Sequence, residues 1–291
     1  MRQTYLGSTD LKVSAIAFGT WAFGGDWGAV DVEESTAVIH RALELGITLF
    51  DTARGYGFGV AERLLGNALR HRVQREDIVI ATKGGLRMDG DTLIRDATAR
   101  RLREGVESSL RSLDTGYIDL LRIHWPDLRT PAEETAEGLE QLVGEGKVGY
   151  VGVSNYNVEQ VEVLRTLGWL DTRQPPYHMF HRDIEDEILP YTRKHDIGVL
   201  VYGPLAHGLL GGRLTAHTTF AADLGVSLPA LAVSWTQTRP AVDVTIVGAH
   251  RPARPDDTAA ADRPLSERDL IDIDLILADS GPMRGPRPEG M

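Results

Sequence analysis

Three short runs of mainly apolar residues each lead directly into a reactive polar residue. Asp51, Lys83 and His124 follow these runs, and Tyr56 stands shortly after Asp51. If the runs are parallel strands of a barrel, their C-terminal ends meet at one mouth, where such barrels carry out their chemistry. The sequence therefore predicts that an acid, a cation, a phenol and an imidazole lie together.

This combination suits the protonation of a carbonyl oxygen. A tyrosine has a reference pKa of ~10, which is too high for a proton donor near neutral pH. An ammonium ~4 Å away, at an effective dielectric constant of ~20, would favour the phenolate by ~4 kcal/mol, or ~3 pKa units before desolvation opposes it. Lys83 would therefore bring Tyr56 into the range of a general acid. Asp51 would hold Lys83 in place, and neutral His124 would orient the carbonyl. The set contains no nucleophile, so the attacking species must be a hydride from a cofactor.

Each of these residues also has an ordinary structural explanation. An aspartate after a strand, such as Asp51, is commonly a cap. Tyr56 alone suggests a half-buried aromatic residue, and His124 alone suggests a satisfied core histidine. Lys83 closes an apolar strand and so needs a partner or a cavity. Their joint occurrence at the same end of successive strands is what favours a functional site.

Short β-branched runs alternate with longer amphipathic stretches, which is the pattern of a parallel sheet covered by helices. Eight such units predict an α/β fold, the (β/α)8 TIM barrel. The strands are expected at residues 15–19, 47–50, 78–82, 118–123, 148–153, 172–175, 198–202 and 244–247. The helices are expected at residues 32–45, 60–70, 94–113, 131–144, 158–167, 185–195 and 228–238, with a short eighth helix after Pro255.

Two pieces lie outside this repeating pattern. Residues 5–14 are expected to form an N-terminal β-hairpin that plugs the lower end of the barrel. Residues 266–278 are expected to form an extra C-terminal helix, opened by a capping box between Ser266 and Asp269. The tail 281–291 is rich in proline and glycine and is expected to be irregular.

Composition and charge narrow the classes of function. The 291 residues slightly exceed the ~250 typical of one barrel, so residues 1–291 are expected to form a single domain. The net charge of −11 disfavours nucleic acid and anionic membranes as partners. The absence of cysteine excludes disulfides, thiolate catalysis and cysteine-bound metal clusters. No apolar run approaches the ~18 residues of a membrane span, and the first residues do not resemble a signal peptide. We therefore expect a cytoplasmic protein.

Two other cofactor signals are weak. The glycine-rich segment 55–59 follows the second expected strand and lacks the third glycine in register, so it does not fit a dinucleotide-binding turn. His178 and His181 are three residues apart on an expected loop, with no carboxylate in a matching register. We therefore expect no metal site.

Five segments together closely resemble the aldo-keto reductase superfamily. They are Asp-Thr-Ala-Arg-Gly-Tyr-Gly at 51–57, Ala-Glu-Arg-Leu-Leu-Gly at 61–66, Ala-Thr-Lys at 81–83, Ile-Asp-Leu-Leu-Arg-Ile-His-Trp-Pro-Asp at 118–127, and Gly-Lys-Val through Gly-Val-Ser-Asn at 146–155. The resemblance extends over nearly the whole chain, from Tyr5 to about Ile273. It implies a barrel that uses NADPH without a metal. It also implies that Tyr56 is the proton donor of a tetrad completed by Asp51, Lys83 and His124.

The resemblance also implies where the nicotinamide and the pyrophosphate bind. Ser154, Asn155 and Gln174 match residues that bind the nicotinamide carboxamide, and Tyr202 matches the aromatic residue that stacks on the nicotinamide ring. Backbone groups after the seventh strand would line the pyrophosphate at Gly203, Pro204, Leu205, Gly208 and Leu210. Many relatives have serine at the position of Gly203, so one polar contact is expected to be missing.

The loop after the last expected strand matches the part of the family that holds the adenosine 2′-phosphate. It contains Gly248, Arg251 and Arg254, and a guanidinium binds phosphate through two parallel hydrogen bonds. In a chain this acidic, two arginines there favour NADP over NAD, with solvated loop arginines as the structural alternative. Pro255 departs from the usual helix start of the family.

Aromatic residues after the first, second and fourth strands are candidate walls of a substrate pocket. They are Trp21, Phe23, Trp27, Phe58 and Trp125. Such walls suit an apolar or aromatic carbonyl substrate, and simple packing at the rim would explain them as well.

The stretch 212–224 is short for a barrel of this kind, because related barrels usually carry a long loop and an extra helix there. Either the enzyme has lost this cover, which leaves a more open pocket, or the printed sequence lacks residues between Phe220 and Ala221. In both cases we expect a weakly ordered segment.

Three functions compete. The first is an NADPH-dependent reductase of small aldehydes or ketones. The second is a cofactor-sensing regulatory subunit with slow turnover, as in some members of the superfamily that associate with channels; an intact tetrad does not separate these two. The third is a Schiff-base aldolase acting through Lys83. It is disfavoured because Asp51 and the nearby phenol keep the lysine charged, whereas a Schiff base needs the free amine. The sequence identifies neither the substrate nor the oligomeric state.

Overall fold

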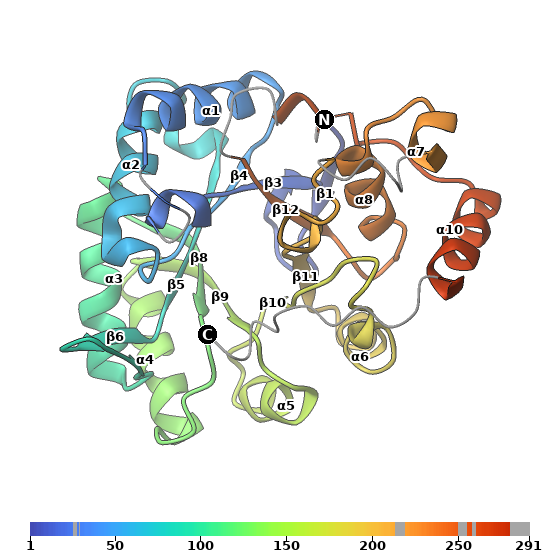
Figure 1. The fold of residues 1–291 in the computed structure, drawn as a ribbon. Helices are drawn as coiled ribbons and strands as arrows, with labels where there is room; N and C mark the ends of the chain where they lie inside the picture. The colour runs from blue at the N-terminus through green and yellow to red at the C-terminus, as the bar shows by residue number, and fades with distance from the viewer. Residues whose placement is uncertain (26–27, 29, 213–218, 250–254, 258–259, 280–291) are drawn as a thin grey trace.

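Eight parallel strands close into a barrel at the centre of the molecule (Figure 1). The computed structural model describes residues 1–25, 28, 30–212, 219–249, 255–257 and 260–279. The strands follow one another around the barrel in chain order, and the last pairs with the first. They are β3 (Ile16–Gly19), β4 (Leu49–Asp51), β5 (Val79–Gly84), β8 (Ile118–Ile123), β9 (Val148–Ser154), β10 (Thr172–Gln174), β11 (Gly198–Val201) and β12 (Val244–Gly248). The predicted (β/α)8 TIM barrel is confirmed.

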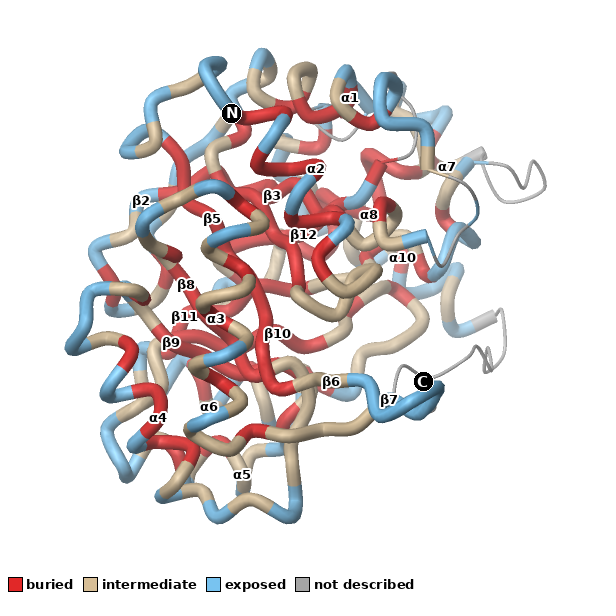
Figure 2. Tube along the Cα trace, turned by 90° about the vertical axis from the view of Figure 1, so that its left-hand side faces the viewer, coloured by how far each residue is buried: buried red, intermediate tan, exposed pale blue. Residues whose placement is uncertain are grey.

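Helices surround the barrel, and the strands form the buried centre (Figure 2). They are α1 (Val32–Glu44), α2 (Val60–Leu69), α3 (Ala99–Leu113), α4 (Ala132–Gly144), α5 (Val158–Thr166), α6 (Ile188–Lys194) and α8 (Leu228–Thr236). A short helix was expected after Pro255. Residues 255–257 are helical, and residues 258–259 lie outside the described part of the chain. The helix expected from residue 185 starts later, because Asp183–Glu185 form a separate 3-10 turn, η4.

The helices begin and face inward as their sequences dictate. Asn157 and Gln160 form a reciprocal capping box at the start of α5, which satisfies backbone groups that the first turn leaves unpaired. In α3 the buried positions are spaced by four, three and four residues, at Leu102, Val106, Ser109 and Leu113. This spacing places one stripe of the helix against the barrel.

The lower end of the barrel is closed by the N-terminal hairpin, as predicted. Strands β1 (Gln3–Tyr5) and β2 (Lys12–Ser14) pair antiparallel, and Leu6 and Val13 are fully buried among the apolar side chains of the barrel interior. The turn depends on Gly7, which has φ +55°. A Cβ at this position would stand 2.2 Å from the backbone nitrogen of Gly198, so only glycine fits.

The extra C-terminal helix is also confirmed. Helix α10 (Glu267–Asp279) begins with the predicted capping box: the Ser266 amide donates to the Asp269 carboxylate (2.8 Å) and the Asp269 amide donates to the Ser266 hydroxyl (3.2 Å). Ile273 on this helix packs into an apolar cluster with Trp235 of α8. The helix therefore covers the outer side of the barrel near α8.

The predicted start of the third helix is wrong. The helix expected from residue 94 begins only at Ala99, and a two-stranded hairpin of β6 (Leu86–Asp89) and β7 (Thr92–Arg95) precedes it. Gly90, with φ +61°, occupies the first central position of the turn. The Gly90-Asp91 pair, with glycine first in a two-residue turn, is the hairpin signal that the helical interpretation overlooked.

The short segment after β11 is partly helical. Residues 213–218 lie outside the described residues, so the expected weak order there is not addressed. Thr219–Asp223 form helix α7, in which Ala221 is buried. Phe220 and Ala221 are therefore consecutive residues of one helical turn, and the expected weak order stays a prediction. No helix in the described part of the chain is long and apolar enough to cross a membrane.

Candidate active site

The four predicted residues meet at the C-terminal mouth of the barrel. The Lys83 ammonium donates hydrogen bonds to the Asp51 carboxylate (2.5 Å) and to the Tyr56 phenolic oxygen (3.1 Å). The ring of His124 meets the Tyr56 ring edge-on, with centroids 5.7 Å apart. The acid, the cation, the phenol and the imidazole therefore form one connected cluster.

Strand register explains this meeting. Asp51 is the last residue of β4 and pairs with Ala81, two residues before Lys83 on β5. His124 directly follows β8, and its amide donates to the carbonyl of Gly84. Because neighbouring parallel strands end at the same edge, the three side chains reach the same mouth.

The loop that carries Tyr56 is anchored from below. Arg54 lies 3.7 Å from the fully buried carboxylate of Glu62, which also accepts a hydrogen bond from the Thr82 hydroxyl (2.8 Å). A Cβ at Gly59 would stand 1.9 Å from the Arg54 guanidinium, so glycine leaves the space for this side chain. The Arg54 and Glu62 positions of the sequence motif therefore serve to place the loop.

Burial and charge set the protonation states of the cluster. Burial alone would raise the pKa of Asp51, but the Arg122 and Lys83 cations hold that pKa below its usual value. Burial lowers the pKa of Lys83 to about 8, against the opposing attraction of Asp51. Burial, helped by the Lys83 charge, lowers the pKa of His124 to about 3. His124 is therefore uncharged near pH 7.

Sequence reasoning missed Arg122. Its side chain is fully buried in the barrel, and its guanidinium contacts the second oxygen of the Asp51 carboxylate. The signal was present, because Leu120, Arg122 and His124 alternate along one strand and so share its inward face. The strand was treated as apolar because its other residues are mostly aliphatic.

The residues predicted to bind the nicotinamide are linked to one another and to the tetrad. The Asn155 amide donates to the carbonyl of His124 (3.0 Å) and accepts from the Tyr202 hydroxyl (2.8 Å). The Ser154 hydroxyl donates to the Gln174 carbonyl (2.9 Å), and the Gln174 amide donates to Asp51 (3.0 Å). Strands β9, β10 and the end of β11 thus bring these polar groups to the same mouth.

The segment predicted to line the pyrophosphate leaves β11 at the same end. Gly203, Pro204 and Leu205 lead into the 3-10 turn η5 (Ala206–Gly208), and Leu210 is buried beyond it. A Cβ at Gly203 or Gly208 would meet nothing within 4 Å, so the backbone is open there. Gly248 ends β12 and is exposed. Arg251 and Arg254 lie outside the described residues.

Three of the five predicted pocket residues lie close to Tyr56 or His124, in space or along the chain. The indole of Trp21 stacks on the Tyr56 ring at 6.4 Å, and Phe58 is half-buried in the loop that carries Tyr56. Trp125 follows His124, and the Arg95 guanidinium lies over its ring at 4.8 Å. Phe23 is a correction: it is 2% exposed and packs on Phe18 in the core, because η1 (Trp21–Gly24) turns its ring inward. Trp27 lies outside the described residues.

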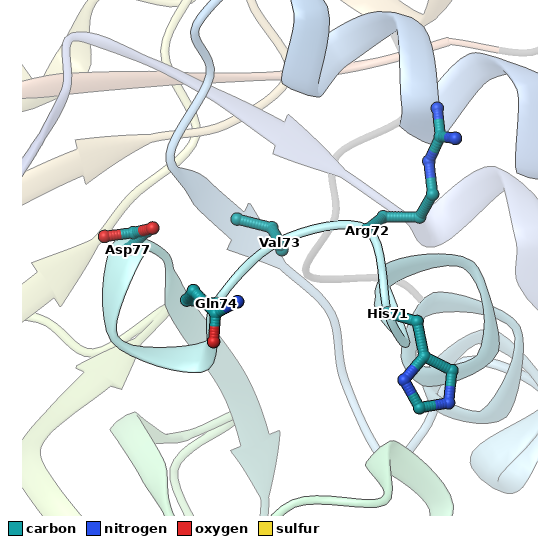
Figure 3. A pocket seen from close by; sticks show the side chains of 5 residues that line it. All are labelled: His71, Arg72, Val73, Gln74 and Asp77. Atoms are coloured by element: carbon teal, nitrogen blue, oxygen red, sulfur yellow. The ribbon is translucent and has the colours of Figure 1, made fainter.

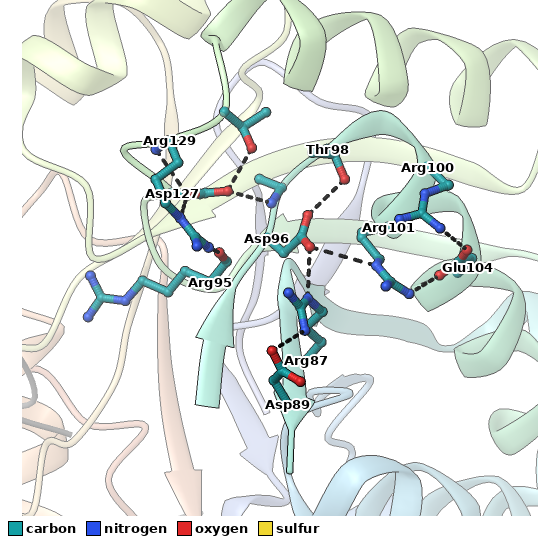
Figure 4. A network of polar contacts seen from close by, with 12 residues as sticks. Arg87, Asp89, Arg95, Asp96, Thr98, Arg100, Arg101, Glu104, Asp127 and Arg129 are labelled. Atoms are coloured by element: carbon teal, nitrogen blue, oxygen red, sulfur yellow. Dashed lines mark hydrogen bonds and ion pairs between the residues drawn. The ribbon is translucent and has the colours of Figure 1, made fainter. Parts of the chain in front are cut away.

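A polar network fixes the rim beside Trp125 (Figure 4). The Asp96 carboxylate accepts from Arg87 (2.9 Å) and from Thr98 (2.7 Å), and Asp127 accepts from the amide of Ala97 (3.1 Å). These contacts tie the β6–β7 hairpin to the loop after β8. The hairpin is therefore a fixed part of the rim, and sequence reasoning had not assigned it to the site.

Two other features take no part in this site. A hollow lined by His71, Arg72, Val73, Gln74 and Asp77 lies in the connection from α2 to β5, at the opposite end of the barrel (Figure 3). His178 and His181 face each other across a single β-bridge, with ring centroids 5.7 Å apart. Within the described ranges, no group of three or more His, Cys, Asp or Glu residues is arranged to hold a metal ion.

The family model for the aldo/keto reductase family matches residues 15–278 of this chain. The chain belongs to the aldo/keto reductase family. Membership of this family supports an NAD(P)H-dependent oxidoreductase activity for this protein. The cluster of Asp51, Tyr56, Lys83 and His124 at the mouth of the barrel agrees with this activity.

Two similar proteins are named as reductases, and a third is named as a channel subunit. An aldo-keto reductase of Bacillus subtilis (strain 168), YhdN, is 36% identical over 313 residues, covering 96% of this chain and 95% of the relative. An NADH-specific methylglyoxal reductase of Escherichia coli (strain K12) is 37% identical, covering 74% of this chain and 71% of the relative. A probable voltage-gated potassium channel subunit beta of Arabidopsis thaliana is 32% identical and covers 86% of this chain and 88% of the relative.

Solved structures confirm the fold. The glycerol dehydrogenase from Gluconobacter oxydans superimposes with a TM-score of 0.88 at 35% identity, covering 98% of both chains. An aldo/keto reductase from Klebsiella pneumoniae, in complex with NADP and acetate, gives a TM-score of 0.81 at 30% identity, covering 97% of this chain and 96% of that one.

Proposed function

We propose that this protein is a reductase that transfers a hydride from NADPH to a small aldehyde or ketone, with Tyr56 as the proton donor. The observation that carries this proposal is the 3.1 Å hydrogen bond from the Lys83 ammonium to the Tyr56 phenol, at the mouth of a barrel of this family. A cation at that distance stabilises the phenolate that proton donation leaves behind.

The residues at and just beyond the ends of β9, β10 and β11 fit a nicotinamide. A carboxamide offers both a hydrogen-bond donor and an acceptor, and the amides of Asn155 and Gln174 offer both in return. Ser154 adds a hydroxyl, and Tyr202 adds an aromatic ring. When bound, the reduced nicotinamide would supply the hydride.

The chain's own groups perform the proton chemistry. Neutral His124 hydrogen-bonds to the carbonyl oxygen and orients the carbonyl toward Tyr56. As the hydride bonds to the carbonyl carbon, the π electrons of the C=O bond move to oxygen, which takes the phenolic proton. Lys83, held by Asp51 at 2.5 Å, stabilises the resulting phenolate, which regains a proton from solvent.

The preference for NADPH rests on two arginines in the loop after β12, Arg251 and Arg254. It is supported by the relative solved with NADP, whereas another relative is named as specific for NADH. Cofactor titration by nicotinamide fluorescence is the test. A dissociation constant at least tenfold lower for NADPH than for NADH is expected, and equal constants would remove the preference.

The substrate class follows from the mouth of the barrel. Trp21, Phe58 and Trp125 offer aromatic walls, and the connection between β11 and α8 is short for a barrel of this kind. The alignment with the Bacillus subtilis relative spans 313 residues, more than this chain contains, so the relative has residues without a counterpart here. We propose an open pocket that accepts an apolar or aromatic carbonyl compound.

A regulatory subunit with slow turnover is the second candidate, favoured by the similarity to the probable channel subunit of Arabidopsis thaliana. A steady-state assay of NADPH oxidation with a panel of aldehydes and ketones separates the two functions. A reductase turns over at least one carbonyl, and Tyr56→Phe lowers kcat by about 100-fold or more while NADPH still binds. Binding of NADPH without turnover of any carbonyl favours the regulatory subunit, and full activity of Tyr56→Phe rules out the proton-donor role.

A further inference from the structure

One carboxylate in the barrel serves two cations. The Lys83 ammonium contacts one oxygen of Asp51 at 2.5 Å, and the Arg122 guanidinium contacts the other. The Gln174 amide donates to that second oxygen at 3.0 Å. Lys83 is 1% exposed and Arg122 is 0% exposed, so water screens neither charge.

The described charges around Asp51 do not balance. The groups that face this cluster are Lys83 from β5, Arg122 from β8, Tyr56 from the loop after β4, and His124 after β8. Burial keeps His124 uncharged near pH 7, so Lys83 and Arg122 are two cations that share the single carboxylate of Asp51. Ionisation of the phenol is the step that would neutralise the remaining positive charge.

The Arg122 guanidinium is incompletely paired, a property that it shares with the buried guanidinium of Arg173 on β10. The Nε and Nη1 atoms of Arg122 are buried without a hydrogen-bond partner among the described residues. A buried guanidinium with two unsatisfied nitrogen atoms is destabilising relative to an apolar side chain of similar size. Packing alone therefore gives no reason for a charge at this position.

We propose that Arg122 is a positioning residue: by sharing the Asp51 carboxylate with Lys83, it keeps an excess positive charge beneath Tyr56 and lowers the pH at which the Lys83–Tyr56 pair loses its proton. The inference rests on the proposed role of Tyr56 as the proton donor. It assigns Arg122 no contact with substrate or cofactor.

The charges determine the direction in which Arg122 shifts the pKa of the Lys83–Tyr56 pair. A positive neighbour disfavours the protonated form of Lys83 and favours the ionised form of Tyr56, so either assignment of the lost proton moves in the same direction. Burial lowers the pKa of Lys83 to about 8 against the attraction of Asp51, and the Arg122 charge contributes to this lowering. Without Arg122 the pair would keep its proton to higher pH. Alcohol oxidation, which needs the phenolate as a base, would then begin at higher pH.

The test compares Arg122→Gln with Arg122→Lys and with Arg173→Gln. Arg173 on β10 is the matched control, because it is 1% exposed and contacts the carbonyl of Tyr156 rather than Asp51. Two readouts are taken: the pH profile of kcat for alcohol oxidation, and the ultraviolet difference spectrum of phenolate formation in the protein without cofactor. Each is recorded with and without Tyr56→Phe, so that the signal of Tyr56 is isolated.

Arg122→Gln is expected to raise the apparent pKa by about one unit in both readouts. Arg122→Lys, which keeps the charge, should restore the wild-type value, and Arg173→Gln should leave it unchanged even if it lowers the melting temperature. Arg122→Met fills the space without a charge and replaces Arg122→Gln if that variant does not fold. An unchanged or lowered apparent pKa in the folded neutral variant overturns the inference. If Tyr56→Phe leaves the wild-type pH profile intact, the proposed function itself fails.

Discussion

The ammonium of Lys83 lies 3.1 Å from the phenolic oxygen of Tyr56, and these two residues come from different strand ends that are separated by 27 positions in the chain. This single contact joins the proposed proton donor to the charge that would stabilise its phenolate. The parallel register of β4 and β5 brings the two side chains together, and Asp51 fixes the lysine from the other side.

Lys83→Met should lower kcat for carbonyl reduction by about 100-fold to 10,000-fold at neutral pH, because the phenolate loses its stabilising cation. The fold should persist, since Asp51 keeps its contact with Arg122. Steady-state kinetics, together with a circular dichroism spectrum, provide the measurement. A folded Lys83→Met enzyme with more than a tenth of the wild-type kcat would contradict the role of this contact.

Acid should destabilise the protein through His124. Its folded-state pKa is lowered by burial to about 3, against ~6.5 in an unfolded chain. Between these values the unfolded chain binds the extra proton, so the free energy of unfolding falls as pH decreases from ~6.5 toward ~3. From pH ~7 to pH ~5 this group accounts for about 2 kcal/mol.

His124→Gln should therefore lose about 2 kcal/mol less stability than the wild type over that pH interval. Urea unfolding at both pH values measures the difference. Equal losses in the two proteins would show that His124 is not held in its neutral form by the fold.

The Arg54–Glu62 contact should hold the Tyr56 loop. Arg54→Ala leaves a fully buried carboxylate without its cation and should cost about 2–4 kcal/mol of stability. Adding Glu62→Gln removes the uncompensated charge, so the double variant should be more stable than Arg54→Ala alone. Chemical denaturation of the four proteins in this cycle gives the answer, and a double variant less stable than Arg54→Ala would refute the coupling.

Gly57 should tolerate alanine much less well than Gly90. Both have φ near +60°, but a Cβ at Gly57 would stand 2.5 Å from the carbonyl oxygen of Gly24, whereas one at Gly90 would meet nothing within 4 Å. Gly90→Ala should cost about 1 kcal/mol through backbone conformation alone. Gly57→Ala should cost more and should also lower kcat, because the loop that carries Tyr56 must move. Melting temperatures and kcat for both variants are the measurements, and equal effects would show that the contact with Gly24 is unimportant.

The sequence by itself was sufficient for the barrel and its tetrad. Buried parallel strands appear in the sequence as short β-branched runs, and each ends where the period of the pattern changes. This pattern alone assigns Asp51, Lys83 and His124 to one mouth of the barrel. The capping box at Ser266 and the plugging hairpin were equally local, because a few neighbouring residues determine them.

Only the tertiary structure determined in which direction individual side chains point and which partners they contact. The role of Arg122 became visible only because the closed barrel places its guanidinium on Asp51. Phe23, predicted as a pocket wall, lies in the core because η1 turns its ring inward. The direction of a side chain and its partner across the barrel are long-range properties, set by strand register and closure. For that reason the charge balance beneath Tyr56 could be read only from the fold.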